Sequence, residues 1–138
     1  MTPPEITALT ATYLIVLQIV LMMSVGLHRA SAKVGVGHGE DENLLRKIRR
    51  HGNLAENAAL FLVALALAEI SGAPSHYVTI LAVLFVVART SHALGFTSLA
   101  GSHATQISGF AALRAVGAFG TAASGVGVAV LLAVQYLG

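Results

Sequence analysis

The chain has 138 residues, and 56% of them are hydrophobic while only 10% carry a charge. Such a composition excludes an ordinary soluble domain, because too few polar side chains are present to cover its surface. A net charge of +2 gives no broad basic surface for nucleic acid, and the lack of cysteine excludes disulfides, thiolate metal sites and a cysteine nucleophile.

Four apolar stretches are each long enough to cross a membrane as a helix, which takes about 20 residues. We expect helices at about residues 6–30, 42–71, 74–96 and 106–136, in a single domain over residues 1–138. Gly72 and Pro74 mark the connection between the second and third of these helices. The connection is only a few residues long, so the two helices should form an antiparallel hairpin. The N-terminus lacks the features of a removable signal peptide, so we expect the first helix to be retained. The predicted fold class is an all-α integral membrane protein with a bundle of four transmembrane helices.

Basic residues gather around the glycine-rich first loop. Six of the eight Lys and Arg residues lie in or beside it, whereas both termini and the second loop, residues 71–76, have none. The positive-inside rule then predicts that the first loop and the third loop, which we expect at residues 101–103, face the cytoplasm. Both termini should lie on the opposite side of the membrane.

The fourth predicted helix carries small residues at a spacing of four, namely Gly117, Thr121 and Gly125. Small side chains allow two helix backbones to approach closely in a membrane. The sequence leaves open whether this face packs within one subunit or against a neighbouring subunit.

Charged and polar residues lie at the start of the second predicted helix, next to the first loop, and continue into its apolar part. Arg46, Arg49, Asn53 and Glu56 are separated by three, four and three residues, so they form one stripe on a helix. An ionisable side chain within the membrane costs at least ~2.5 kcal/mol and therefore needs a partner or a ligand. Arginine can bind a carboxylate, asparagine can donate and accept, and glutamate can bind an ammonium group, so the stripe suits a zwitterion. The alternative for Arg46, Lys47 and Arg50 is that they are ordinary charges flanking a membrane helix.

Three further arginines lie within or at the ends of the predicted helices. Arg89 is followed one turn later by His92, and we expect Arg89 to form an ion pair with Glu56. Arg114 is the only charged residue of the fourth predicted helix. Arg114 and Arg29 can each also be read as arginines that extend toward lipid headgroups.

Histidines at positions 28, 51, 92 and 103 raise the alternative of a haem or metal site. They lie near one interface of the membrane and do not form a metal-binding motif such as HExxH. We therefore expect neither metal nor haem.

The polar segments resemble the membrane-associated proteins in eicosanoid and glutathione metabolism, the MAPEG family, and most of all its small bacterial members. Four motifs carry the resemblance: Gly26-Leu-His-Arg29, Arg46-x-x-Arg49-x-His51-x-Asn53-x-x-Glu56-Asn57, Arg89-x-x-His92-x-x-x-Phe96 and Leu113-Arg114-Ala-Val-Gly117. The chain departs from the family at Phe96, where catalytic members usually have tyrosine.

The resemblance implies a homotrimer in a bacterial inner membrane, with glutathione bound between neighbouring subunits near the cytoplasmic side. Arg114, followed by Arg29, is then the candidate to stabilise the glutathione thiolate. The candidate residues for binding glutathione are Arg46, Arg49, His51, Asn53, Glu56, Asn57 and His92.

We expect a glutathione-dependent membrane enzyme that conjugates hydrophobic electrophiles or reduces lipid hydroperoxides. The main alternative is a non-catalytic trimeric scaffold that binds lipid or another ligand, since the family includes such a member and Phe96 lacks the tyrosine hydroxyl. A small transporter is a further alternative, but the chain has no inverted repeat to support it.

Overall fold

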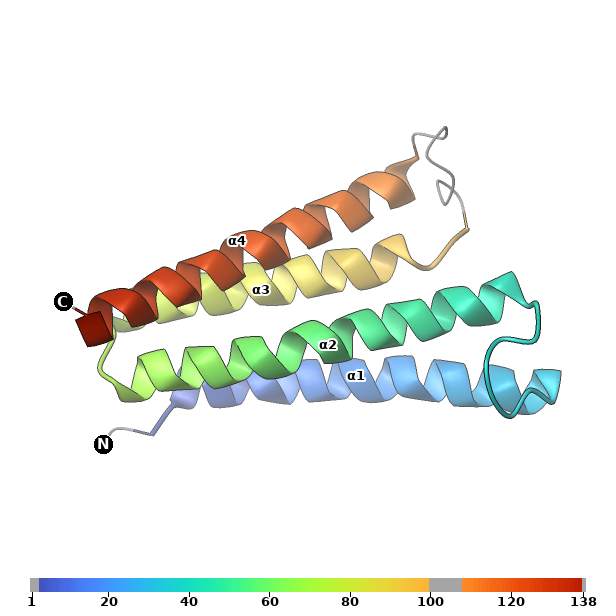
Figure 1. The fold of residues 1–138 in the computed structure, drawn as a ribbon, viewed down its shortest axis with the longest axis horizontal. Coiled ribbons are helices and arrows are strands. Elements are labelled where there is room, and N and C mark those ends of the chain that lie inside the picture. Colours follow the sequence, from blue (N-terminus) through green and yellow to red (C-terminus); the bar gives the residue numbers. More distant parts are fainter. Residues whose placement is uncertain (1–2, 100–107, 138) are drawn as a thin grey trace.

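The computed structural model describes residues 3–99 and 108–137, which fold as a bundle of four long helices (Figure 1). In chain order these are α1 (Glu5–Ala32), α2 (Glu42–Ile70), α3 (Ser75–Gly95) and α4 (Gly109–Leu137). All four are long and apolar enough to cross a membrane. The predicted fold class is confirmed. The predicted third loop at residues 101–103, the predicted start of the fourth helix near residue 106 and His103 lie outside the described residues.

The surface of the bundle is apolar, as a lipid environment requires. Large hydrophobic side chains are exposed along all four helices, among them Leu9, Leu60, Val83 and Phe119. The interior is small and is built around Phe61 of α2 and Phe85 of α3, whose rings stack with centroids 3.8 Å apart. The chain is thus an integral membrane protein that crosses the membrane several times.

The N-terminus of α1 is capped by the far end of α2. Glu69 Oε1 accepts a hydrogen bond from the Ile6 N–H at 2.9 Å, and Oε2 accepts from the N–H and the hydroxyl of Thr7 at 2.9 and 2.7 Å. The first N–H groups of a helix have no partner within the helix, and a carboxylate also suits its positive end. Glu69 thereby joins α1 to α2 at the end of the bundle where the chain begins.

The α4 helix lies directly on α3, as Figure 1 shows. A methyl group added at Gly117 would lie 2.5 Å from His92 Cβ, and one added at Gly120 would lie 2.8 Å from Ala88 Cβ. Gly117 therefore packs within the subunit. Gly125 has open space where its side chain would be, so the residues that the structure describes leave this end of the small-residue face uncovered.

Candidate functional site

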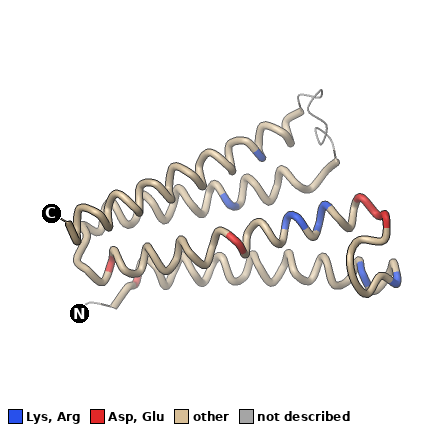
Figure 2. Tube along the Cα trace, in the orientation of Figure 1, with Lys and Arg blue, Asp and Glu red and all other residues tan. Residues whose placement is uncertain are grey.

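The basic residues of the helices lie in the half of the bundle next to the first loop. Figure 2 shows basic residues on α2, α3 and α4 in this half, with acidic residues at the start of α2 and near its middle. The side of α2 that faces α4 carries most of the stripe predicted from the sequence. Three adjoining pockets lie along this side.

The first pocket brings three arginines of one chain together. It has a volume of about 340 Å³ and lies between the start of α2, the end of α3 and the start of α4. Its lining residues are Glu42, Leu45, Arg46, Arg49, Phe96, Leu99 and Arg114. The three arginines outnumber the one acidic residue, Glu42, so the pocket suits a ligand with carboxylate groups.

Two of these arginines are held by the C-terminus of α3. Arg114 Nη1 donates a hydrogen bond to the Gly95 carbonyl at 2.9 Å, and Arg46 Nη1 donates to the Phe96 carbonyl. The last carbonyls of a helix lack partners within the helix and form its negative end. These contacts satisfy two such groups and fix the two guanidinium groups beside the pocket.

The second and third pockets extend the site along α2. The second has a volume of about 310 Å³, shares Arg49 with the first pocket and is also lined by Asn53 and Glu56. The third, of about 330 Å³, shares Glu56 and is otherwise mostly apolar between α2 and α4, with Leu60 and Val128 in its wall. The site therefore runs from a mainly cationic end, past the carboxylate of Glu56, to an apolar end.

Arg89 does not form the ion pair with Glu56 that the sequence predicted. Its guanidinium contacts Thr121 Oγ1 at 2.9 Å, Asn53 Oδ1 at 3.1 Å and His92 Nδ1 at 3.2 Å. These acceptors come from α4, α2 and α3 and bind both terminal nitrogens of the guanidinium, while its buried Nε has no hydrogen-bond partner among the described residues. The Glu56 side chain is exposed beside the pockets. Thr121 was not among the residues predicted for the site, because hydroxyl groups occur throughout the sequence and only the packing of α4 on α3 brings this one to Arg89.

The remaining predicted site residues lie in different surroundings. Asn57 lines the apolar pocket and donates a hydrogen bond through Nδ2 to the Asn53 carbonyl at 2.8 Å. His51 points toward α1, where the amide nitrogen of Gln18 donates to its Nε2 at 2.8 Å. Arg29 is at the end of α1 and donates to the Gly35 carbonyl at 3.3 Å. The chain does not bring His51 or Arg29 to the pockets beside α4.

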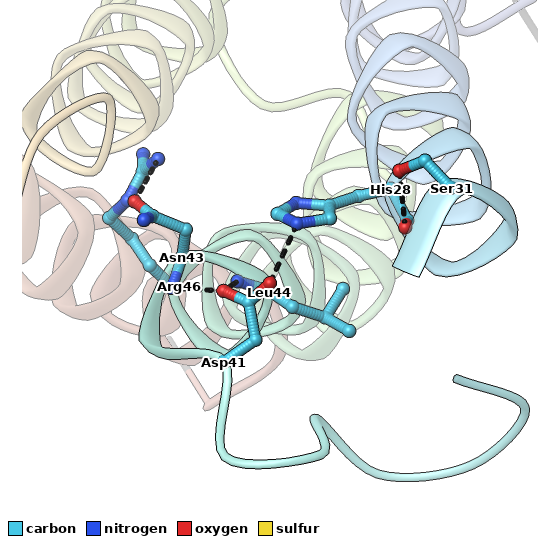
Figure 3. Close-up of polar contacts among 6 residues, drawn as sticks. All are labelled: His28, Ser31, Asp41, Asn43, Leu44 and Arg46. Atoms are coloured by element: carbon cyan, nitrogen blue, oxygen red, sulfur yellow. Dashed lines mark hydrogen bonds and ion pairs between the residues drawn. The ribbon is translucent and has the colours of Figure 1, made fainter. Parts of the chain in front are cut away.

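The first loop is anchored to the start of α2 by Asp41. Figure 3 shows its carboxylate between the ring of His28 and the N-terminus of α2. Asp41 Oδ2 lies 2.9 Å from His28 Nε2, and Oδ1 accepts from the N–H groups of Asn43 and Leu44 at 2.9 and 3.0 Å. The hydrogen bond from Leu44, and next the contact with His28, lower the pKa of Asp41 against the opposing effect of partial burial. This cap fixes the helix turn that carries Arg46.

The described part of the chain contains no group of three or more His, Asp or Glu residues that could hold a metal ion. The polar groups of the site are arginines, amides and the carboxylates of Glu42 and Glu56, which bind organic ions through hydrogen bonds.

The fold and the site define an integral membrane protein with four helices and a pocket lined by three arginines. The MAPEG family profile matches residues 7–134, so the chain belongs to the MAPEG family. The family predicted from the sequence is thereby confirmed. Membership supports a function related to glutathione in a general sense, as a transferase, a peroxidase or a related protein. No individual curated protein or solved structure matches the chain.

Proposed function

We propose that the protein is a glutathione-dependent membrane enzyme that acts on hydrophobic electrophiles or lipid hydroperoxides, with a role in detoxification. The observation that carries the proposal is the continuity of the three pockets along α2. The first and second pockets share Arg49, and the second and third share Glu56. Together they lead from three arginines to an apolar groove. A soluble acidic thiol and an apolar substrate could therefore meet in one site.

Glutathione has two carboxylates, one ammonium group and one thiol, and the polar part of the site offers a complement to each charged group. Arg46 and Arg49 would bind carboxylates, and Glu56 would bind the ammonium group. Asn53 would form a hydrogen bond with the peptide. For Asn57, His51 and His92 a role in binding glutathione remains a proposal based on the family motif.

Arg114 is proposed to stabilise the thiolate of glutathione. A free thiol has a pKa of about 8.5, and each unit by which the pKa falls corresponds to about 1.4 kcal/mol. A guanidinium group at about 4 Å in an effective dielectric of about 20 contributes up to about 4 kcal/mol before desolvation is subtracted. One arginine is thus sufficient to make the thiolate the main species at neutral pH, and the thiol proton is released to water.

The two proposed reactions use the same thiolate. In conjugation, the sulfur forms a bond to an electrophilic carbon and a leaving group such as halide departs with the electrons of the broken bond. In peroxide reduction, two glutathione molecules and one hydroperoxide give glutathione disulfide, the alcohol and water. Both need an apolar groove that is continuous with the thiol site, and Leu60, Phe61 and Val128 line the apolar end of the three pockets.

The proposal includes a homotrimer in a bacterial inner membrane, with the first and third loops in the cytoplasm and the termini on the opposite side. Arg49 and Glu56 are exposed on each subunit although both lie in a membrane-spanning helix. A neighbouring subunit would cover these charges, and its Arg29 could then complete the site. Native mass spectrometry in a mild detergent should show trimers, and monomers alone would contradict this part of the proposal.

An activity assay separates the enzyme from a non-catalytic scaffold. Purified protein in detergent is mixed with glutathione and either a chromogenic aryl halide or cumene hydroperoxide, with protein-free detergent as the blank. The proposal expects turnover above the blank that disappears in Arg114→Ala and remains in Arg50→Met, which removes a charge outside the three pockets. Glutathione binding without turnover of either substrate would favour the scaffold.

A further inference from the structure

Arg89 is the most deeply buried charge among the residues described. Its side chain is 2% exposed and lies at the junction of α2, α3 and α4. It lines none of the three pockets, so it has no part in the proposed chemistry. Asn53, one of its three contacts, lines the second pocket, which is the middle one of the three, together with Arg49 and Glu56.

A guanidinium group can only donate hydrogen bonds, and this property fixes the roles of its partners. The Thr121 hydroxyl donates to the Gly117 carbonyl at 2.7 Å, so its oxygen accepts from Arg89. Asn53 likewise accepts through Oδ1, and His92 accepts through Nδ1. Asn53 therefore keeps the two hydrogens of Nδ2 for other partners, and neutral His92 carries its proton on Nε2.

We infer that Arg89 is a positioning residue that turns the Asn53 amide so that it donates to the ligand. This inference rests on the proposed binding of glutathione and makes it more specific. Asn53 should bind an acceptor of the tripeptide, a carboxylate or an amide carbonyl. The ammonium group, which can only donate, is left to Glu56. By orienting the Asn53 amide, Arg89 thus determines which end of a zwitterionic ligand binds next to Asn53 in the second pocket.

The variant Asn53→Asp tests the direction of this hydrogen bond. Aspartate keeps an acceptor for Arg89 but removes the donor that would face the ligand. We expect the thermal unfolding temperature to be retained or raised, while glutathione affinity measured by calorimetry falls by roughly tenfold or more. If Asn53 instead accepted from the ligand ammonium, the added negative charge would strengthen binding. Equal or tighter binding by Asn53→Asp would therefore overturn the inference.

The variants of Arg89 test whether it sets the orientation. We expect Arg89→Met to weaken glutathione binding and Arg89→Lys, which keeps a cationic donor, to restore part of it. Arg50→Met is the matched control, because it removes an arginine outside the pockets, and it should bind as the parent does. Thr121→Val, which removes one acceptor of Arg89, gives a milder test if Arg89→Met fails to fold, and it should also weaken binding.

The tautomer of His92 gives a readout that a general loss of stability would not produce. Nitrogen-15 NMR of histidine-labelled protein without ligand should show His92 with a bare Nδ1 and a protonated Nε2, the signal being assigned with His92→Gln. Loss of this tautomer in Arg89→Met, and its retention in Arg89→Lys, would support the inference. The same tautomer and the same glutathione affinity in Arg89→Met would overturn it. Failure of the proposed function would look different, because the parent itself would then bind no glutathione.

Discussion

The guanidinium carbon of Arg114 lies 5.3 Å from the centre of the Phe96 ring. Arg114 also donates to the carbonyl of Gly95, the residue that precedes Phe96. The ring and the carbonyl together hold the proposed thiolate-stabilising group at the end of α3. Phe96 stands where the family resemblance leads us to expect tyrosine, and its contact with Arg114 predicts a role for the aromatic ring without the hydroxyl.

The ring of Phe96 can be tested separately from the missing hydroxyl. Phe96→Leu removes a cation–π contact of about 0.5–1 kcal/mol and should reduce thiolate formation by a few-fold. Phe96→Tyr keeps the ring and adds a hydrogen-bonding group, so it should tighten glutathione binding by about 0.5–1.5 kcal/mol. Calorimetry and the aryl halide assay measure the two effects. If the leucine variant matches the parent in both assays, the ring does not help to position Arg114.

Among the residues that the structure describes, Glu56 is the only acidic one that lines the second and third pockets. Glu56→Gln should weaken glutathione binding by about 1–3 kcal/mol, because a charge-assisted hydrogen bond to the ligand ammonium is lost. Titration calorimetry on folded protein gives the affinity. Glu40→Gln, a change in the exposed first loop, is the control and should bind normally. An unchanged affinity in Glu56→Gln would remove Glu56 from the ligand site.

Glu69 should contribute to the stability of the bundle and not to ligand binding. Glu69→Ala removes the acceptor of three hydrogen bonds from Ile6 and Thr7, and we expect a loss of about 1–3 kcal/mol. Thermal unfolding in detergent should show a lower midpoint for Glu69→Ala, whereas Glu5→Gln, at an exposed position nearby, should leave it unchanged. Equal midpoints for these two variants would show that the cap contributes nothing.

The Asp41 cap predicts how the first loop responds to acid. The hydrogen bond from Leu44 and the contact with His28 hold the pKa of Asp41 below its ordinary value of 3.8. Folding therefore favours the ionised carboxylate, so the stabilisation is complete above pH 3.8 and is lost as the pH falls through the lowered value. Hydrogen exchange at the Asn43 and Leu44 amides should accelerate in that range. Asp41→Asn caps without titrating and should remove this dependence; an unchanged acid response in the variant would contradict the assignment.

The four helices were predictable from the sequence because few backbone structures are stable inside a membrane. A segment that crosses lipid must satisfy its backbone internally, so about 20 apolar residues in a row define a helix. The stripe of Arg46, Arg49, Asn53 and Glu56 followed from helix periodicity alone, and three of these residues line the middle pocket together. Local spacing was sufficient in both cases.

Contacts between helices were not predictable in the same way. The partners of Arg89 depend on the register of α4 against α3, which is set by the close approach at Gly117 and Gly120. His51 belongs to the sequence motif of the stripe, but its position on the helix turns it toward Gln18 of α1. The sequence showed which residues needed partners in the membrane, and only the packing of the helices selected those partners.

The most direct test of the proposed function is the formation of the glutathione thiolate on the protein near neutral pH. Mixing purified protein with glutathione in a stopped-flow instrument should give ultraviolet thiolate absorbance and an equivalent release of protons. Arg114→Ala should abolish both signals while calorimetry still detects bound glutathione, and Arg114→Lys should retain part of them because the positive charge remains. Thiolate formation in Arg114→Ala at the level of the parent would contradict the role of Arg114, and its absence in the parent would contradict the enzymatic function.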